Sequence, residues 1–160
     1  MKKLNNMIKK LIFISVFSLF NIFFSYFLMP KSLKWYNKLN ISFLKPPSWV
    51  FSIVWIYIYL SWFIVIYYIY KNIKSIKREL ISNYIKNFIK LIIIELMWII
   101  LFYFNKLEFC IITILITNIF TIKNFLDGYK IKKTIGYILL PQLLWLIIAA
   151  ILNIHTYILN

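Results

Sequence analysis

The stretch WYNKLNISFLKPPSWVFSIVW, from Trp35 to Trp55, lies between two long hydrophobic runs. It holds three of the six tryptophans of the chain, together with the adjacent pair Pro46 and Pro47. A plain connection between membrane segments does not need so much aromatic surface. A short connection that is aromatic and stiffened by proline instead predicts a lid that folds back over a helix bundle.

The composition is that of an integral membrane protein. The 160 residues are 63% hydrophobic and 21% aromatic, with a mean hydropathy of +0.83. Only 14% are charged, whereas soluble domains have about a quarter. Several apolar runs reach the roughly 20 residues that a helix needs to cross a bilayer, and the period-two alternation of membrane strands is absent. Because every connection is short, we expect one membrane domain over residues 1–160.

The hydrophobic pattern predicts an all-α bundle of five transmembrane helices. Pro30 ends the first run, and Pro47 suits the start of a helix because the missing N–H costs nothing there. Asp127–Gly128 is a turn signal, Thr134 is a suitable N-cap, and Pro141 inside the last segment predicts a kink. The expected helices cover residues 11–29, 47–70, 88–104, 107–125 and 134–158.

The basic residues orient this bundle. With five spans, 14 of the 19 lysines and arginines fall on the side of the N-terminus. Cytoplasmic loops carry the excess of positive residues, so we expect a cytoplasmic N-terminus and an outward-facing Trp-rich loop. The net charge of +15 therefore does not indicate a nucleic-acid partner. The expected location is a bacterial cytoplasmic membrane, because no transit peptide precedes the first helix.

Three of the predicted helices carry an aromatic stripe. The stripes are Trp55, Tyr59 and Trp62; Glu95, Trp98 and Phe102; and Gln142, Trp145, Ala149 and Leu152. Residues three and four apart share a helix face, so convergence of the stripes encloses a flat, aromatic cavity for a large planar ligand. An interfacial aromatic belt is an equal alternative for Trp35, Tyr36 and Trp62. A belt fits Trp98 and Trp145 less well, because both lie about ten residues, or roughly 15 Å, from the end of a span.

Glu95 lies inside a predicted span, where a carboxylate is expensive and functional by default. Gln142 and Asn153 are the candidate partners on another helix, and the alternative is that the acid is protonated. A structural hydrogen bond between helices is the competing interpretation, and it is the one we favour for Asn118.

Other kinds of site are not indicated. His155 is the single histidine and Cys110 the single cysteine, so neither a metal site of several histidines nor an intrachain disulfide is expected. No hydrolase nucleophile elbow and no glycine-rich phosphate loop is present. We therefore expect no metal, no obligatory cofactor and no catalytic residue, with haem ligation by His155 as a minor alternative.

The motifs resemble those of the TspO/translocator protein family, also called tryptophan-rich sensory proteins or peripheral benzodiazepine receptors. The family pattern WYxxLxKPsWxPPxWvFgpvWxxLY is matched here by Trp35-Tyr36, Leu39, Pro46-Pro47, Trp49-Val50-Phe51, Val54-Trp55 and Tyr59. The third-helix pattern NxxWxxxFF is similar to Glu95, Trp98, Phe102 and Tyr103. The fifth-helix pattern LLxPYxxWxxfAtxLN is similar to Leu139-Leu140-Pro141, Trp145, Ala149, Leu152 and Asn153.

This resemblance implies a five-helix bundle, usually a homodimer, that binds porphyrins such as protoporphyrin IX and haem, and isoquinoline or benzodiazepine drugs. It implies a ligand site between the first loop and the second, third and fifth helices. The expected ligand-binding residues are Trp35, Tyr36, Leu39, Pro46, Trp49, Trp55, Tyr59, Glu95, Trp98, Phe102, Gln142, Trp145, Ala149 and Leu152. We expect a sensor, scavenger or transporter of tetrapyrroles. The alternatives are an enzyme that degrades porphyrin in light through Trp55 and Trp145, and a regulator that acts through a protein partner.

Several positions depart from the family pattern. Ile41-Ser42 replaces the Lys-Pro of the loop, Glu95 replaces an asparagine, and Gln142 replaces a tyrosine. The last two replacements change the polarity of the expected site, so ligand preference need not match that of the family. No Lys or Arg follows Tyr157, so cholesterol binding is not expected.

Overall fold

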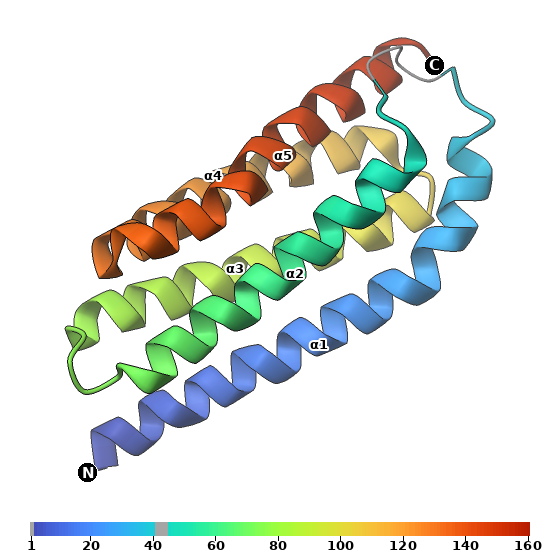
Figure 1. The fold of residues 1–160 in the computed structure, drawn as a ribbon. Helices are drawn as coiled ribbons and strands as arrows, with labels where there is room; N and C mark the ends of the chain where they lie inside the picture. The colour runs from blue at the N-terminus through green and yellow to red at the C-terminus, as the bar shows by residue number, and fades with distance from the viewer. Residues whose placement is uncertain (1, 41–44) are drawn as a thin grey trace.

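The computed structural model describes residues 2–40 and 45–160, and helices make up nearly all of this part of the chain (Figure 1). The five helices are α1 (Lys2–Tyr36), α2 (Ser48–Lys71), α3 (Arg78–Tyr103), α4 (Leu107–Ile131) and α5 (Lys133–Ile158). The all-α class predicted from the sequence is confirmed over the described residues.

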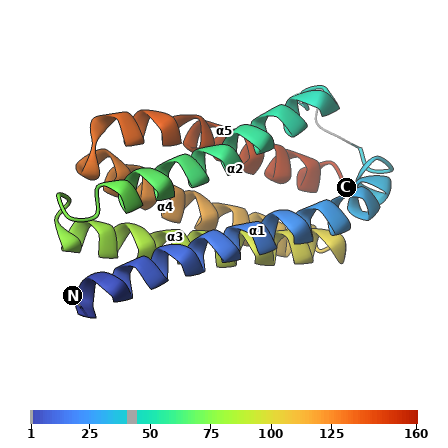
Figure 2. The same ribbon diagram turned by 60° about the horizontal axis from the view of Figure 1, so that its bottom comes forward.

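The helices form a ring rather than a layer. Helix α1 packs against α2 and α3, α4 packs closely against α3 and α5, and α2 closes the ring by contacting α5. The order around the bundle is therefore α1, α2, α5, α4, α3, and the two termini lie at opposite ends (Figures 1 and 2). Helix α2 packs less closely on its neighbours than α3, α4 and α5 pack on one another.

Four of the five helices, all except α3, are long and apolar enough to cross a membrane. Lys86, Lys90 and Glu95 interrupt the apolar part of α3. Together with the apolar composition, these helices make the chain an integral membrane protein. The prediction of five spans is therefore supported only in part: four helices are candidate spans, and a crossing by α3 remains a proposal.

Helix α1 is longer than the sequence predicts. The expected end at Pro30 is wrong, because the helix continues through this residue to Tyr36. Proline removes one backbone hydrogen bond from a helix interior, which weakens the helix at Pro30 but does not require it to end there. A helix also remains the only single-segment structure that satisfies its own backbone in lipid. As a result Trp35 belongs to the last turn of α1 and not to a loop.

The connection between α4 and α5 also differs from the prediction. Asp127–Gly128 is not a turn, because both residues lie inside α4, where Asp127 accepts a hydrogen bond of 2.6 Å from Asn87 of α3. This contact between α3 and α4 supports a helix where the local sequence favours a turn. The helices meet at Lys132, whose extended backbone precedes α5, so Thr134 is not the N-cap. Pro141 lies inside α5, as expected.

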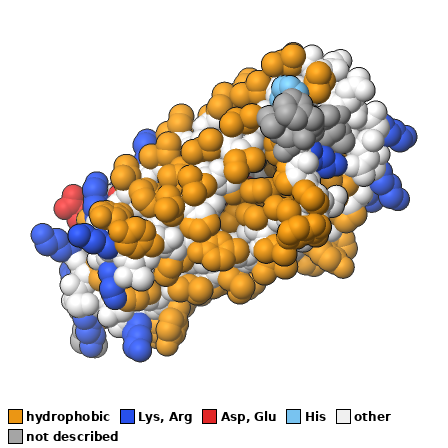
Figure 3. Space-filling view, turned by 45° about the horizontal axis from the view of Figure 1, so that its top comes forward, with side chains coloured by type: hydrophobic (Ala, Val, Ile, Leu, Met, Phe, Trp, Pro, Cys, Tyr) orange, Lys and Arg blue, Asp and Glu red, His pale blue; other side chains and the backbone are white. Residues whose placement is uncertain are grey.

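The surface agrees with a position in a membrane. Hydrophobic side chains cover the middle of the face shown in Figure 3, and Lys and Arg side chains gather at both ends of the molecule. Many large apolar residues of α1 are exposed, among them Phe13, Val16 and Phe23. Such a belt is costly in water and favourable in lipid.

Candidate functional site

The centre of the bundle holds four residues, Tyr59, Trp62, Glu95 and Gln142, which we call the polar centre. Trp62 is fully buried, and its indole N–H donates to the Oε1 atom of Gln142 across 2.9 Å. Its ring contacts Tyr59 at 5.3 Å, edge to face. These contacts join α2 to α5 and rule out an interfacial belt position for Trp62.

Glu95 belongs to the same centre. It is only 2% exposed, and Tyr59 lies close enough to interact with it electrostatically. The hydroxyl of Tyr59 is 3.3 Å from that of Ser25 on α1, so α1, α2 and α3 meet at this level. Among the described residues, neither carboxyl oxygen of Glu95 has a hydrogen-bond partner.

The expected partners of Glu95 are therefore wrong. Gln142 accepts its hydrogen bond from Trp62, and its Nε2 atom is buried without a partner among the described residues. Asn153 accepts a hydrogen bond from the Trp98 indole at 3.4 Å and donates to the carbonyl of Ala149. Both side-chain amides therefore bond to groups other than the Glu95 carboxyl group. The spacing of residues in the sequence does not reveal these partners.

A second aromatic group surrounds Phe102 of α3. Trp98 stacks on Phe102 at 5.0 Å with an interplanar angle of 13°. Trp35 and Tyr36, from the last turn of α1, contact the same ring at 5.7 and 5.4 Å. The structure therefore brings together four of the predicted site residues from helices distant in sequence.

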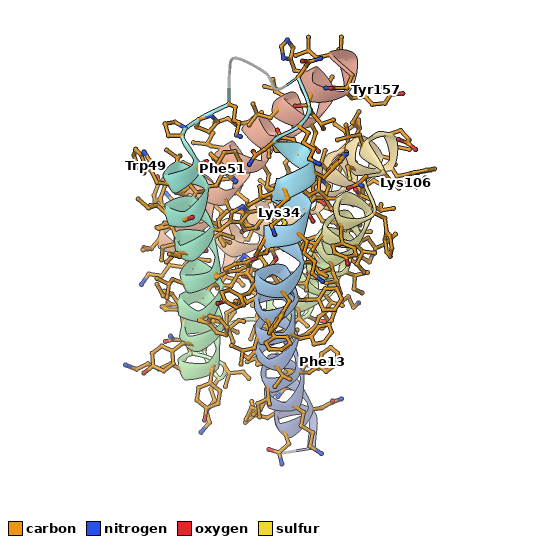
Figure 4. The ribbon with its side chains drawn as sticks, turned by 90° about the vertical axis from the view of Figure 1, so that its right-hand side faces the viewer. Phe13, Lys34, Trp49, Phe51, Lys106 and Tyr157 are labelled. Carbon is orange, nitrogen blue, oxygen red and sulfur yellow. The ribbon has the colours of Figure 1, made fainter. Side chains whose placement is uncertain are left out.

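A third group joins α2 to α5. Trp145 is 7% exposed and contacts Phe51 at 5.2 Å, edge to face. Phe51 is not among the residues predicted for the site, although it lies four residues before Trp55 on the same helix face. Trp49, which is among them, is 65% exposed and lies on the outer side of α2, as Figure 4 shows.

The remaining predicted residues lie around these groups. Trp55 contacts Tyr59 at 5.5 Å. Ala149 packs in one small cluster with Trp98, and Leu152 is buried on the same helix. Leu39 and Pro46 are half-buried at the end of the bundle. Of all the predicted site residues, Trp49 alone is strongly exposed.

The segment after α1 is tied to the C-terminal end of α5. Asn40 donates its backbone N–H to the side-chain oxygen of Asn160 at 3.0 Å, and Asn160 donates back to the Asn40 carbonyl at 2.9 Å. The hydroxyl of Tyr36 lies 3.4 Å from that of Thr156. These contacts place part of the predicted lid over the bundle end. Ile41 and Ser42, where the loop departs from the family pattern, lie outside the described residues.

The polar centre is closed to solvent, since both carboxyl oxygens of Glu95 are fully buried. Two hollows lie elsewhere, one of about 450 Å³ beside the α2–α3 connection and one of about 630 Å³ on the outer face of α1. Helix α2 packs least closely on the rest of the ring.

Asn118 has the structural role that its sequence context indicates. Its Nδ2 atom donates to the carbonyl of Ile114 within α4 and to that of Leu146 on α5, at 2.9 and 3.0 Å. Within residues 2–40 and 45–160, no three His, Cys, Asp or Glu side chains lie together as a group that could hold a metal ion.

Comparison with known proteins assigns the chain to a family. A search of curated proteins finds no match. The sequence model of the TspO/MBR family, by contrast, matches residues 12–159 of the 160-residue chain. The match covers all three aromatic groups and the polar centre. The chain therefore belongs to the TspO/MBR family.

Proposed function

We propose that this protein binds a tetrapyrrole inside the helix bundle and acts as a sensor, scavenger or transporter of it. Family membership supports this proposal. The observation that carries it is the inward position of aromatic rings from four helices: rings of α1 and α3 gather around Phe102, and Phe51 of α2 contacts the buried Trp145 of α5. Large aromatic side chains bind planar hydrophobic ligands by offset stacking and edge contacts.

In this proposal the macrocycle enters where α2 meets α5 and stacks between Trp55, Trp98 and Trp145. The carboxylates of a porphyrin then point toward the bundle end, because the polar centre already contains a carboxyl group. A cation is available there, since the ammonium of Lys45 lies 5.3 Å from the centre of the Tyr36 ring. Charge-assisted contacts of this kind orient a ligand.

A fluorescence titration tests the proposal. Protoporphyrin IX is added to the purified protein in detergent, and quenching of tryptophan emission gives the dissociation constant. We expect saturable quenching, and about tenfold weaker binding in Trp145→Ala, because a large buried contact surface is lost.

Trp49→Ala is the matched control, because it also removes one indole, but one that is 65% exposed. It is expected to bind as tightly as the unaltered protein. If both variants weaken binding equally, or if Trp145→Ala changes nothing, the interior site is refuted.

The degradation of porphyrin in light through Trp55 and Trp145 remains a second prediction. Illumination of the same samples distinguishes it from reversible binding. Loss of the Soret band with a new product band indicates the enzyme, whereas reversible binding leaves the absorbance spectrum stable.

We also propose that α3 crosses the membrane, which makes five spans. Its residues Arg78–Tyr103 extend about 39 Å at 1.5 Å per residue, longer than the roughly 30 Å hydrocarbon core. The termini at opposite ends of the bundle are consistent with an odd number of spans. A cytoplasmic N-terminus, a bacterial cytoplasmic membrane and a homodimer remain predictions that go with this topology.

A further inference from the structure

The carboxyl group of Glu95 is buried without the polar partners that such a group needs. It is 2% exposed, and neither oxygen has a hydrogen-bond partner among the described residues. A buried polar group without a partner lowers the stability of a fold, and a buried charge does so more strongly. Such a group persists where it serves a function.

Among the described residues, no lysine or arginine forms an ion pair with the carboxyl group of Glu95. Lys90 is the closest cation in sequence on α3, but its side chain is exposed and its ammonium lies 5.5 Å from the centre of the Phe120 ring. Lys86 is exposed as well. Within the part of the chain that the structure describes, no ion pair of Glu95 is present, so a bound molecule can supply the counter-charge of the ionised carboxyl group.

The residues around Glu95 indicate which chemical groups the bound molecule has. Tyr59 lies within electrostatic range, and its ring contacts Trp55 and Trp62. Aromatic faces attract cations through the negative charge of their π-systems. A carboxyl group and several ring faces in one apolar interior form the combination that recognises an aromatic molecule bearing a protonated nitrogen.

We propose that Glu95 makes the interior site select planar aromatic ligands that carry a protonated nitrogen over neutral or anionic ligands of the same shape. This inference rests on the proposed function, because it assumes that planar ligands enter the bundle. It adds the class of ligand that the site prefers. A carboxylate-bearing porphyrin binds with its acidic groups away from Glu95, whereas a cationic ligand places its nitrogen against it.

Three tricyclic probes of one shape test the inference. They are 9-aminoacridine, which is a cation at neutral pH, anthracene, which is neutral, and anthracene-9-carboxylate, which is an anion. Binding to the purified full-length protein in zwitterionic detergent is measured by tryptophan quenching. We expect the cation to bind at least about tenfold more tightly than the neutral probe, which corresponds to about 1.4 kcal/mol, and the anion to bind most weakly.

The variant Glu95→Gln keeps the size of the side chain and removes its charge. It is expected to bind the cation and the neutral probe within about twofold of each other, while protoporphyrin IX binding is retained. If Glu95→Gln does not fold, Glu95→Asn is used for the same binding measurements. The control is Glu79→Gln, which removes an exposed carboxylate from the first turn of the same helix and is expected to leave the preference unchanged.

The outcomes separate the two claims. If protoporphyrin IX binds and the cation preference is absent, or persists in Glu95→Gln and in Glu95→Asn, this inference is overturned and the proposed function stands. If neither protoporphyrin IX nor any probe binds, both are overturned. A cation preference that is lost only when Glu95 is replaced supports the inference.

Discussion

Replacement of Glu95 by leucine is expected to stabilise the ligand-free protein. Most substitutions of buried residues destabilise a protein, by about 1 kcal/mol on average, so the opposite sign is a sharp test. Leucine has a similar volume and no polar atom, whereas both carboxyl oxygens of Glu95 are buried without a partner among the described residues. The hydroxyl of Tyr59 keeps its contact with Ser25, so no new unsatisfied group is created there.

The expected change in the free energy of unfolding follows from the number of buried polar groups that lack a hydrogen-bond partner. One buried polar group without a partner costs about 1–3 kcal/mol, and more if it is charged. Glu95→Leu removes one such carboxyl group and adds apolar packing, so the free energy of unfolding should rise by about 1–3 kcal/mol. For a chain of this size, each kcal/mol moves the unfolding midpoint by about 2–4 °C. Glu95→Gln should give a smaller rise, because the amide remains polar.

Cys110 provides the assay. It is the only cysteine of the chain and is fully buried between the helices. A dye that becomes fluorescent on reaction with a thiol therefore reports its exposure as the detergent-solubilised protein is heated. Circular dichroism at the helix wavelength checks that the dye follows global unfolding.

Glu79→Gln is the control for this prediction also. Its carboxylate is exposed in the first turn of α3, where it interacts favourably with the helix dipole by about 0.3–1 kcal/mol. We therefore expect an unchanged or slightly lower midpoint. A loss of more than about 1 kcal/mol in Glu95→Leu would show that the carboxyl has a stabilising partner, and the reasoning on the polar centre would be refuted.

Three further predictions concern packing. Trp62→Phe removes the N–H that donates to Gln142 and should lower the free energy of unfolding by about 1–3 kcal/mol in the same dye assay. Gly136→Ala places a Cβ atom 2.6 Å from the ring of Tyr129, so it should separate α4 from α5 and cost about 1–3 kcal/mol, measured in the same way. Asn160→Ala removes the hydrogen bonds that tie the segment after α1 to α5, and faster amide hydrogen exchange in that segment should reveal its release; unchanged exchange would contradict the tie.

Much of the fold follows from local sequence. The start of α2 after Pro47, the start of α4 at Leu107 and the position of Pro141 inside α5 lie where the sequence places them. The start of α2 depends on Pro47, whose missing N–H costs nothing at the start of a helix. The end of α1 and the helical Asp127–Gly128 segment do not follow from local sequence, because packing between helices overrides the local signal of proline and glycine. These two boundaries were wrong for that reason, and the expected start of the third helix at residue 88 was wrong as well, because α3 begins at Arg78.

The candidate site was predictable in part. Three- and four-residue spacing put Trp55, Tyr59 and Trp62 on one helix face, and their rings are in contact in the structure. Spacing within one helix cannot tell which way a residue near a helix start points, so it did not separate Trp49 from Phe51. It also could not show that Gln142 bonds to an indole rather than to a carboxyl group.

The sequence by itself determined that this is a membrane protein of five helices in the TspO/MBR family, with a carboxyl group inside an apolar segment. These properties depend on composition and on periodicity along single helices, both of which are local. The tertiary structure alone decided which side chains meet: the three aromatic groups, the indole bond to Gln142 and the isolation of Glu95. The reason is that contacts between helices depend on the rotation and order of the helices around the ring, which no single segment encodes.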